Sequence, residues 1–213
     1  MRHSLLTIEG NIGSGKTTVS SMIARDTGAR LILEEFADNP FLPKFYASPE
    51  RYAFPLELYF MAERYQQLKT AIGSSRDLFQ QSVVSDYIFT KSVIFAKVTL
   101  GVEEFQLYKR LFDIINPTLP IPDLLVYLYA PIDQLLANIK KRGRDYEQSI
   151  PADYLIRLQE TYMDYFRQSP NLTVLVVDTK DVDFLSQPQA YQRLLKEIDK
   201  DYDKGLHYVE VAG

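Results

Sequence analysis

The chain has 213 residues and no cysteine, which predicts one domain of ordinary size and excludes disulfides and thiolate metal sites. Its net charge of −4 argues against a protein that is dedicated to binding nucleic acid or a membrane surface. Because the sequence has no signal-peptide pattern and no apolar run long enough to span a bilayer, we expect a cytoplasmic protein without nucleic-acid or membrane partners.

Short apolar runs alternate with longer helical patterns along the chain. The apolar runs predict strands over Leu5–Ile8, Arg30–Leu33, Ser82–Ser85, Leu124–Tyr129 and Leu172–Val177. The helical patterns cover Lys16–Asp26, Glu50–Ile72, Ile88–Leu100, Glu103–Ile115, Ile132–Lys141, Pro151–Arg167 and Pro188–Asp201. Such alternation predicts an α/β fold in which a five-stranded parallel sheet carries helices on both faces. We expect a single domain over residues 1–203 and a mobile tail over residues 204–213.

A glycine-rich loop follows the first predicted strand, with the spacing Gly10-x-x-x-x-Gly15-Lys16-Thr17. Its glycines allow a tight turn in which backbone N–H groups point at one centre, and the next helix adds its positive N-terminal dipole. Lys16 is expected to reach the β- and γ-phosphates of a nucleotide, and Thr17 to offer its hydroxyl to Mg²⁺. The expected phosphate contacts in this loop are Gly10, Asn11, Ile12, Gly13, Ser14, Gly15, Lys16, Thr17 and Thr18.

Acidic side chains stand at the ends of the next two predicted strands. Glu34 and Glu35 close the second strand, and Asp86 closes the third. Because ligands of such a sheet bind beyond the carboxyl ends of its strands, these carboxylates would face the γ-phosphate together. Each acid taken alone could equally well cap a helix or pair with a surface lysine, but their convergence at the loop end of the sheet favours a functional role.

A basic segment with the sequence KKRGRDYE follows the helix after the fourth strand. The glycine between Arg142 and Arg144 suits a lid over about residues 141–150 that bends over the phosphates. The alternative is a solvated helix C-terminus, where cations are favourable in any case. The acidic and aromatic residues that follow directly favour the lid.

The signatures of GTPases and of motor ATPases are missing from the sequence. It has no convincing run of four apolar residues that ends in a magnesium-binding Asp, and no N-K-x-D motif for guanine. Phosphoryl transfer to a small molecule needs only a phosphate clamp, Mg²⁺, mobile cations and a carboxylate near the accepting hydroxyl. The sequence therefore favours a kinase.

Five motifs point to one family. In chain order they are IEGNIGSGKTT, EEFADNPFLPKFY, YASPERYAFPLELYF with MAERY, SDYIFTKSVIFA and IKKRGRDYE, over roughly the first seven-tenths of the chain. This set resembles the bacterial deoxyribonucleoside kinases of the deoxyguanosine/deoxyadenosine kinase type, which are related to animal deoxycytidine and deoxyguanosine kinases. The resemblance implies a P-loop kinase fold with a five-stranded parallel sheet and an arginine-rich lid, usually in a homodimer. It also implies transfer of the γ-phosphate of Mg-ATP to the 5′-hydroxyl of a deoxynucleoside.

The resemblance also implies roles for individual residues. Glu34 would take the proton from the 5′-hydroxyl, while Tyr46 and Glu147 would hydrogen-bond the 3′-hydroxyl. Phe95 would stack on the base and Arg64 would lie near the base edge.

The donor side is assigned in the same way. Arg142 and Arg144 would contact the donor phosphates, and Arg142 would act in catalysis together with Lys16. A turn over Asp181–Phe184 would lie beside the adenine of ATP.

Two positions depart from the family pattern. Glu57 stands where the family commonly has Gln, and an ionised carboxylate can only accept hydrogen bonds. It could bridge the two neighbouring donors of guanine, so we expect deoxyguanosine to be favoured over deoxyadenosine, unless Glu57 instead bonds Arg64 or another cation. The segment SDY lacks the family's arginine, which leaves two roles open for Asp86: holding Mg²⁺ through water, or sharing the base role with Glu34.

Two other functions are alternatives to that of a deoxynucleoside kinase. A thymidylate-kinase-like enzyme would need extra cations for a monophosphate acceptor, and residues 34–60 offer only Lys44 and Arg51. A nucleotide-binding module without catalysis would not need the intact phosphate loop, the strand-end Glu34 and the lid arginine together.

Overall fold

The computed structural model describes residues 2–34, 39–73 and 82–211. In this part of the chain, one parallel sheet has six strands in the order β2-β3-β1-β4-β5-β6. The strands are β1 (Leu5–Gly10), β2 (Arg30–Ile32), β3 (Val83–Ser85), β4 (Leu124–Tyr129), β5 (Thr173–Asp178) and β6 (Gly205–Glu210). The parallel α/β architecture is as predicted.

The sixth strand corrects both the predicted number of strands and the predicted tail. Residues expected to form a mobile tail over 204–213 include β6, which pairs along its whole length with β5. The N–H of Gly205 donates to the carbonyl of Leu172 at 2.7 Å, where the ladder begins. This edge strand is only partly buried and Tyr208 is largely exposed, so its sequence lacks the continuous apolar run by which the inner strands are identified.

The described residues form helices α1 (Lys16–Thr27), α2 (Leu42–Ala47), α3 (Pro49–Gly73), α4 (Lys91–Thr99), α5 (Val102–Ile115), α6 (Ile132–Arg142), α7 (Ala152–Arg167) and α8 (Pro188–Ile198). The short helix α2 was not predicted. The helix expected from Ile88 begins at Lys91 instead, after a tight loop. Among the described helices, none is both long enough and apolar enough to cross a bilayer.

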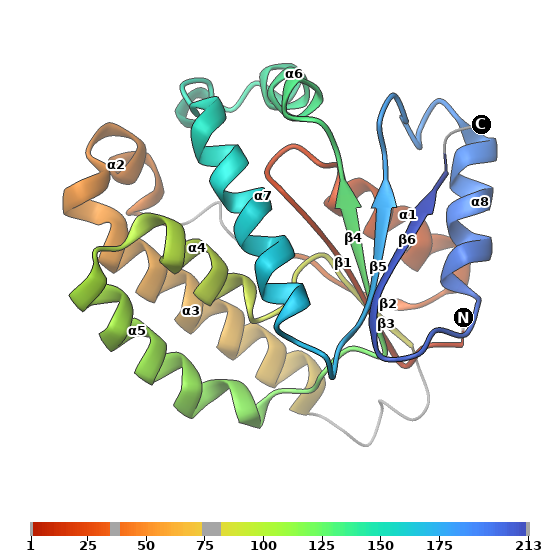
Figure 1. Cartoon of the computed structure of the whole chain (residues 1–213), viewed down its shortest axis with the longest axis horizontal. Helices are drawn as coiled ribbons and strands as arrows, with labels where there is room; N and C mark the ends of the chain where they lie inside the picture. The colour runs from red at the N-terminus through yellow and green to blue at the C-terminus, as the bar shows by residue number, and fades with distance from the viewer. Residues whose placement is uncertain (1, 35–38, 74–81, 212–213) are drawn as a thin grey trace.

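Helices cover the sheet on two sides, as Figure 1 shows: α1 and α8 lie on one side, and α3, α4, α5 and α7 on the other. One core cluster joins α1 and α8 to the inner strands through residues such as Ile23 and Leu194. Another joins α4 and α7 to the opposite face through Ile94, Tyr162 and Phe166. The inner strand β4 is buried from Leu124 to Leu128, as expected for a parallel strand covered on both faces.

The carboxyl ends of the strands point toward α2, α6 and the start of α7 (Figure 1). Strand β1 lies between β3 and β4, so connections leave it toward both halves of the sheet. This is the topological switch point at which open α/β sheets bind ligands. The glycine-rich loop begins there, at the end of β1.

Candidate active site

The glycine-rich loop is held in shape by its own backbone and by neighbouring helices. Gly13 has a left-handed φ of +85°, and a Cβ there would lie 2.7 Å from the carbonyl oxygen of Leu135 in α6. The side chain of Asn11 donates to the carbonyl of Leu155 in α7 at 2.8 Å and accepts from the N–H of Ile12 at 2.8 Å. The loop is therefore preorganised, with its open side at the N-terminus of α1.

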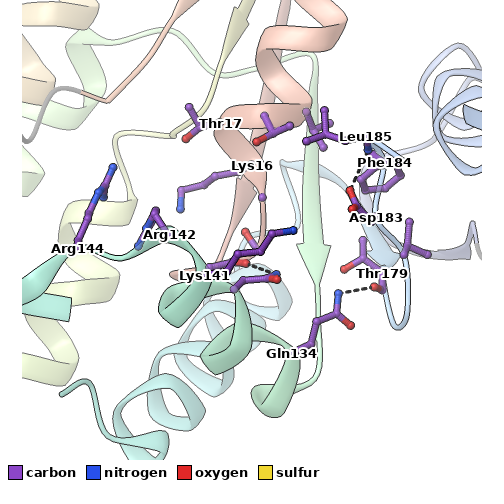
Figure 2. A pocket seen from close by; sticks show the side chains of 17 residues that line it. Lys16, Thr17, Gln134, Lys141, Arg142, Arg144, Thr179, Asp183, Phe184 and Leu185 are labelled. Carbon is purple, nitrogen blue, oxygen red and sulfur yellow. Dashed lines mark hydrogen bonds between the residues drawn. The ribbon is translucent and has the colours of Figure 1, made fainter. Parts of the chain in front are cut away.

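A cavity of about 480 Å³ lies against this loop. Its walls are Gly13–Val19, four residues of α6, Arg144 and the turn that contains Thr179 and residues 182–185. Figure 2 shows Lys16, Arg142 and Arg144 directed toward one side of the cavity, while Asp183, Phe184 and Leu185 lie on the other. Cations thus gather at one end of this donor cavity, and the predicted turn contributes aromatic and apolar side chains at the other.

Thr17 and Asp86 form an oxygen pair beside the loop. The Thr17 hydroxyl donates to Oδ2 of Asp86 at 2.6 Å, and Oδ1 of Asp86 accepts from the backbone N–H of Glu34 at 2.7 Å. Among the described residues, no group of three or more His, Cys, Asp or Glu side chains could hold a metal. A hydroxyl and a carboxylate still fit Mg²⁺, which typically takes one or two protein oxygens and completes its shell with phosphate and water.

Glu34 lies at the centre of a buried charge cluster. Its Oε1 accepts from Nε and Nη2 of Arg64 at 2.7 and 2.6 Å, and its Oε2 from Nζ of Lys91 at 2.5 Å. Burial alone would raise the pKa of Glu34, but the positive charges of Lys91, Arg64 and Lys16 hold it well below the usual range. Glu34 is therefore ionised at any physiological pH. The adjacent Glu35 lies outside the described residues.

A second, smaller cavity of about 100 Å³ adjoins this cluster. The seven side chains expected at the nucleoside all line it: Glu34, Tyr46, Glu57, Arg64, Asp86, Phe95 and Glu147. Four residues line both this acceptor cavity and the donor cavity, namely Lys16, Thr17, Arg142 and Arg144. Of the remaining loop positions, Gly10 and Asn11 line neither cavity, and Ile12 lines only the acceptor cavity.

The lid and α2 meet beside the acceptor cavity. Glu147 accepts from Arg142 and, at 3.2 Å, from Arg144, so the carboxylate expected at the 3′-hydroxyl also holds both lid arginines. Tyr46 stacks on Tyr146 of the lid with ring centroids 5.9 Å apart. Burial, together with the charge of Glu147, raises the pKa of Tyr46 above its usual value, so its hydroxyl keeps its proton.

Glu57 also lines the acceptor cavity, and its two carboxylate oxygens differ in their hydrogen-bond partners. Its Oε1 accepts from the Thr99 hydroxyl at 3.0 Å, whereas the buried Oε2 has no hydrogen-bond partner among the described residues. Burial raises the pKa of Glu57 to about 7. Arg64 hydrogen-bonds Glu34 and the Ser92 hydroxyl rather than Glu57, so the ion pair considered as an alternative is not present in the described structure.

Two buried charged residues beside the site were missed from the sequence. Lys91 brings a positive charge to Glu34 from a position five residues after Asp86, in the same segment that lacks the family's arginine. Glu9 is fully buried in β1 and accepts from the N–H groups of Gly10 and Ile88, at 3.0 and 3.1 Å, and from the Tyr162 hydroxyl at 3.1 Å. The only signal for either residue was a charge within an otherwise apolar run.

Comparisons with known proteins relate the chain to deoxynucleoside kinases. The family model for deoxynucleoside kinases matches residues 6–202. Deoxyguanosine kinase of Bacillus subtilis (strain 168) is 36% identical over 200 residues, which cover 91% of this chain and 95% of that protein. Deoxyadenosine/deoxycytidine kinase of the same organism is 29% identical over 204 residues, which cover 92% of each chain.

A solved structure supports the same fold. Deoxyadenosine kinase from M. mycoides with bound dATP matches with a TM-score of 0.79 and 23% identity, over 92% of this chain and 99% of that one. The extent of the family match, from β1 to beyond α8, leaves little of the chain outside it. The chain belongs to the deoxynucleoside kinase family and is an ATP-dependent phosphotransferase.

Proposed function

We propose that this protein transfers the γ-phosphate of Mg-ATP to the 5′-hydroxyl of a purine deoxyribonucleoside in nucleoside salvage, with deoxyguanosine favoured and deoxyadenosine next. The observation that carries the proposal is the shared wall between the two cavities. Lys16, Thr17, Arg142 and Arg144 line both, and Glu34 lines the acceptor cavity beside them. A phosphoryl group that leaves the donor cavity would therefore pass cations on its way to a carboxylate-bound hydroxyl.

Glu34 is the proposed acceptor of the hydroxyl proton. Its low pKa makes it a weak base, but the transition state of phosphoryl transfer is loose and the hydroxyl loses its proton late. The main contribution of Glu34 is then to orient the hydroxyl toward the phosphorus atom. Lys16 and the two lid arginines stabilise the charge on the phosphoryl oxygens.

Thr17 and Asp86 are the proposed residues at Mg²⁺. The Thr17 hydroxyl would bind the ion directly, and Asp86, already hydrogen-bonded to that hydroxyl, would reach it through water. When bound, Mg²⁺ neutralises part of the phosphate charge. Because Asp86 is hydrogen-bonded to Thr17, the proposed ligand of Mg²⁺, we assign Asp86 to the metal and the base role to Glu34.

The lining of the acceptor cavity suits both the sugar and the base of a deoxynucleoside. The protonated Tyr46 hydroxyl and the Glu147 carboxylate supply a donor and an acceptor for the sugar 3′-hydroxyl. Phe95 offers an aromatic face for the base. Glu57 lines the same cavity, and we propose that its Oε2, which has no partner among the described residues, accepts from guanine, whose N1–H and 2-amino group are neighbouring donors.

The base preference can be tested with Glu57→Gln. The parent protein should phosphorylate deoxyguanosine with a higher kcat/KM than deoxyadenosine, and Glu57→Gln should lower that ratio by about tenfold or more, since an amide can pair with adenine. Glu63→Gln, on an exposed position of the same helix, is the matched control. A panel that includes nucleoside monophosphates as acceptors tests the acceptor class, and an unchanged ratio in Glu57→Gln would assign base selection to other residues.

We also propose a homodimer, as the resemblance implied. Exposed apolar residues on α5 offer a face for a second copy: Val102, Leu107, Leu111 and Ile114. Their spacing along α5 places several of them on one side of the helix, away from the buried Tyr108 and Phe112. Sedimentation equilibrium gives the mass in solution, and a monomer at all concentrations would exclude this proposal.

A further inference from the structure

Lys91 is a buried cation at the site for which the proposed function has no role. It opens α4, is only 4% exposed, and lines the acceptor cavity beside Lys16 and Thr17. Its Nζ lies 2.5 Å from Oε2 of Glu34 and 5.4 Å from the centre of the Phe95 ring. A lysine buried to this degree is unusual unless it is paired, and here its partner is the carboxylate proposed to receive the 5′-hydroxyl.

The two cations on Glu34 are held differently. Arg64 is fixed by a second partner, because its Nη1 donates to the Ser92 hydroxyl at 2.9 Å. Within the described residues, the Lys91 ammonium donates only to Glu34, although it carries three N–H groups on a flexible stem. Lys91 can therefore change its partner, whereas Arg64 keeps Glu34 in place.

Lys16 and Lys91 are close enough for their charges to interact. Burial, followed by the charge of Lys91, lowers the pKa of Lys16 to about 8. Two buried cations of like charge are unfavourable side by side unless an anion lies between or beside them. The carboxylates of Glu9, Glu34 and Asp86 offset part of this repulsion, and the phosphoryl group in transfer adds a further anion whose charge is spread over three equatorial oxygens.

We propose that Lys91 is a catalytic residue that contacts the phosphoryl group during transfer, from the acceptor side and opposite Lys16. This inference rests on the proposed function. The 5′-hydroxyl takes the position of the ammonium at Oε2 of Glu34, and the ammonium turns to an equatorial oxygen of the γ-phosphoryl group. A bond forms between the 5′-oxygen and the γ-phosphorus while the bond to the β–γ bridging oxygen breaks. ADP leaves with that electron pair, and the hydroxyl proton passes to Glu34.

The test compares Lys91→Met with Lys97→Met, a substitution at an exposed position of the same helix. Isothermal titration calorimetry measures the binding of ADP and of the best nucleoside separately, and then of ADP with aluminium fluoride and that nucleoside together. The fluoride complex mimics the phosphoryl group in transfer. For Lys91→Met we expect kcat to fall by about 10²- to 10³-fold, the two separate Kd values to stay within about threefold, and the fluoride to give no tightening.

Two results would overturn the proposal. One is fluoride tightening in Lys91→Met equal to that of the parent, which would place Lys91 away from the transferred group. The other is a loss of nucleoside affinity as large as the loss of kcat, which would make Lys91 a structural partner of Glu34 only. If Lys91→Met does not fold, Lys91→Gln is measured in its place, since it keeps a hydrogen-bond donor without the charge.

The complex with ADP, aluminium fluoride and the nucleoside also distinguishes failure of this inference from failure of the proposed function. Fluoride tightening reports contacts to the phosphoryl group and does not require proton transfer. Loss of tightening in Lys91→Met, together with normal turnover in Glu34→Ala, would therefore keep the phosphoryl contact of Lys91 and reject the role of Glu34. Absence of any nucleoside phosphorylation by the parent protein would reject the proposed function, and failure of fluoride to tighten its ADP complex would reject Lys91 as well.

Discussion

The donor and acceptor cavities share a wall but are built in different ways. The donor cavity, about 480 Å³, is formed by one continuous loop, the helix that follows β4 and the turn after β5, and the backbone geometry of the loop shapes it. The acceptor cavity, about 100 Å³, collects charged side chains from α3, α4, the lid and the ends of β2 and β3, and aromatic side chains from α2. Substitutions should therefore act through backbone strain on the donor side and through charge and hydrogen bonding on the acceptor side.

Loss of Glu34 should give the largest effect and should fall on the acceptor side alone. In Glu34→Ala we expect kcat to decrease by about 10³-fold, since positioning and proton acceptance by a carboxylate contribute about 10²–10⁴. The KM for ATP should change by less than about threefold, because no loop contact is lost. Steady-state kinetics with both substrates measure the two effects.

The same substitution leaves Arg64 and Lys91 without their buried partner. This should lower the free energy of unfolding by about 3–5 kcal/mol, which urea denaturation would show. Glu34→Gln keeps an acceptor for Arg64 and should be better folded but equally slow. Glu63→Ala, at an exposed position of α3, should change neither property, and rapid turnover by Glu34→Gln would transfer the base role to another group.

A methyl group at Gly13 should damage the donor side instead. An alanine there must keep a φ of +85° with its Cβ 2.7 Å from the Leu135 carbonyl, or else the loop must shift. We expect a KM for ATP about tenfold higher or more, a nucleoside KM within about twofold, and a stability loss of about 1–3 kcal/mol.

The matched control for this substitution is Gly28→Ala. Gly28 also has a positive φ, +66°, but a Cβ there meets no atom within 4 Å, and it lines neither cavity. Gly28→Ala should lower the free energy of unfolding through backbone strain and leave the KM for ATP unchanged. Equal changes of the ATP and nucleoside KM values in Gly13→Ala would show that the two sides are not independent.

The donor side could be predicted from the sequence because its chemistry is local. Gly10 to Thr18 is one stretch, and its spacing specifies both the turn and the helix that follows. The strand-end positions of Glu34 and Asp86 were also predictable, because parallel strands present their carboxyl ends at one edge. What joins them, the hydrogen bond from the Glu34 N–H to Asp86, follows from that placement.

Most side chains of the acceptor cavity were expected only from the family resemblance and not from residue patterns, because their contacts join distant residues. Lys91 reaches Glu34 across 57 positions of sequence, and within IFTKSVIF it is indistinguishable from a lysine on the solvent side of a helix. Glu9 occupies a strand position that alternation would equally well assign to solvent. The edge strand β6 was missed for a different reason. It is partly exposed, so its sequence lacks the continuous apolar run that indicates a buried strand.

The smallest expected effect is a pH dependence of base preference, which arises at Glu57 in the acceptor cavity. Burial raises the pKa of Glu57 to about 7, against the lowering effects of Arg64, the Thr99 hydrogen bond and Lys91. Below this pH the neutral carboxyl carries an O–H donor and can pair with adenine, and above it the carboxylate only accepts. The ratio of kcat/KM for deoxyguanosine to that for deoxyadenosine should therefore rise several-fold between about pH 6 and about pH 8.

Because both rates come from one protein, titrations that affect both substrates equally cancel in this ratio. The ratio should be flat in Glu57→Gln, and a parallel rise in that variant would assign the effect to another group.

The pH dependence of the unfolding free energy tests the same pKa independently. The folded pKa lies above the ordinary value of 4.5, so ionisation of Glu57 disfavours the folded state increasingly from about pH 4.5 to about pH 7. Over that window, Glu57→Gln should gain about 1–3 kcal/mol of unfolding free energy relative to the parent, because the amide has no charge to bury.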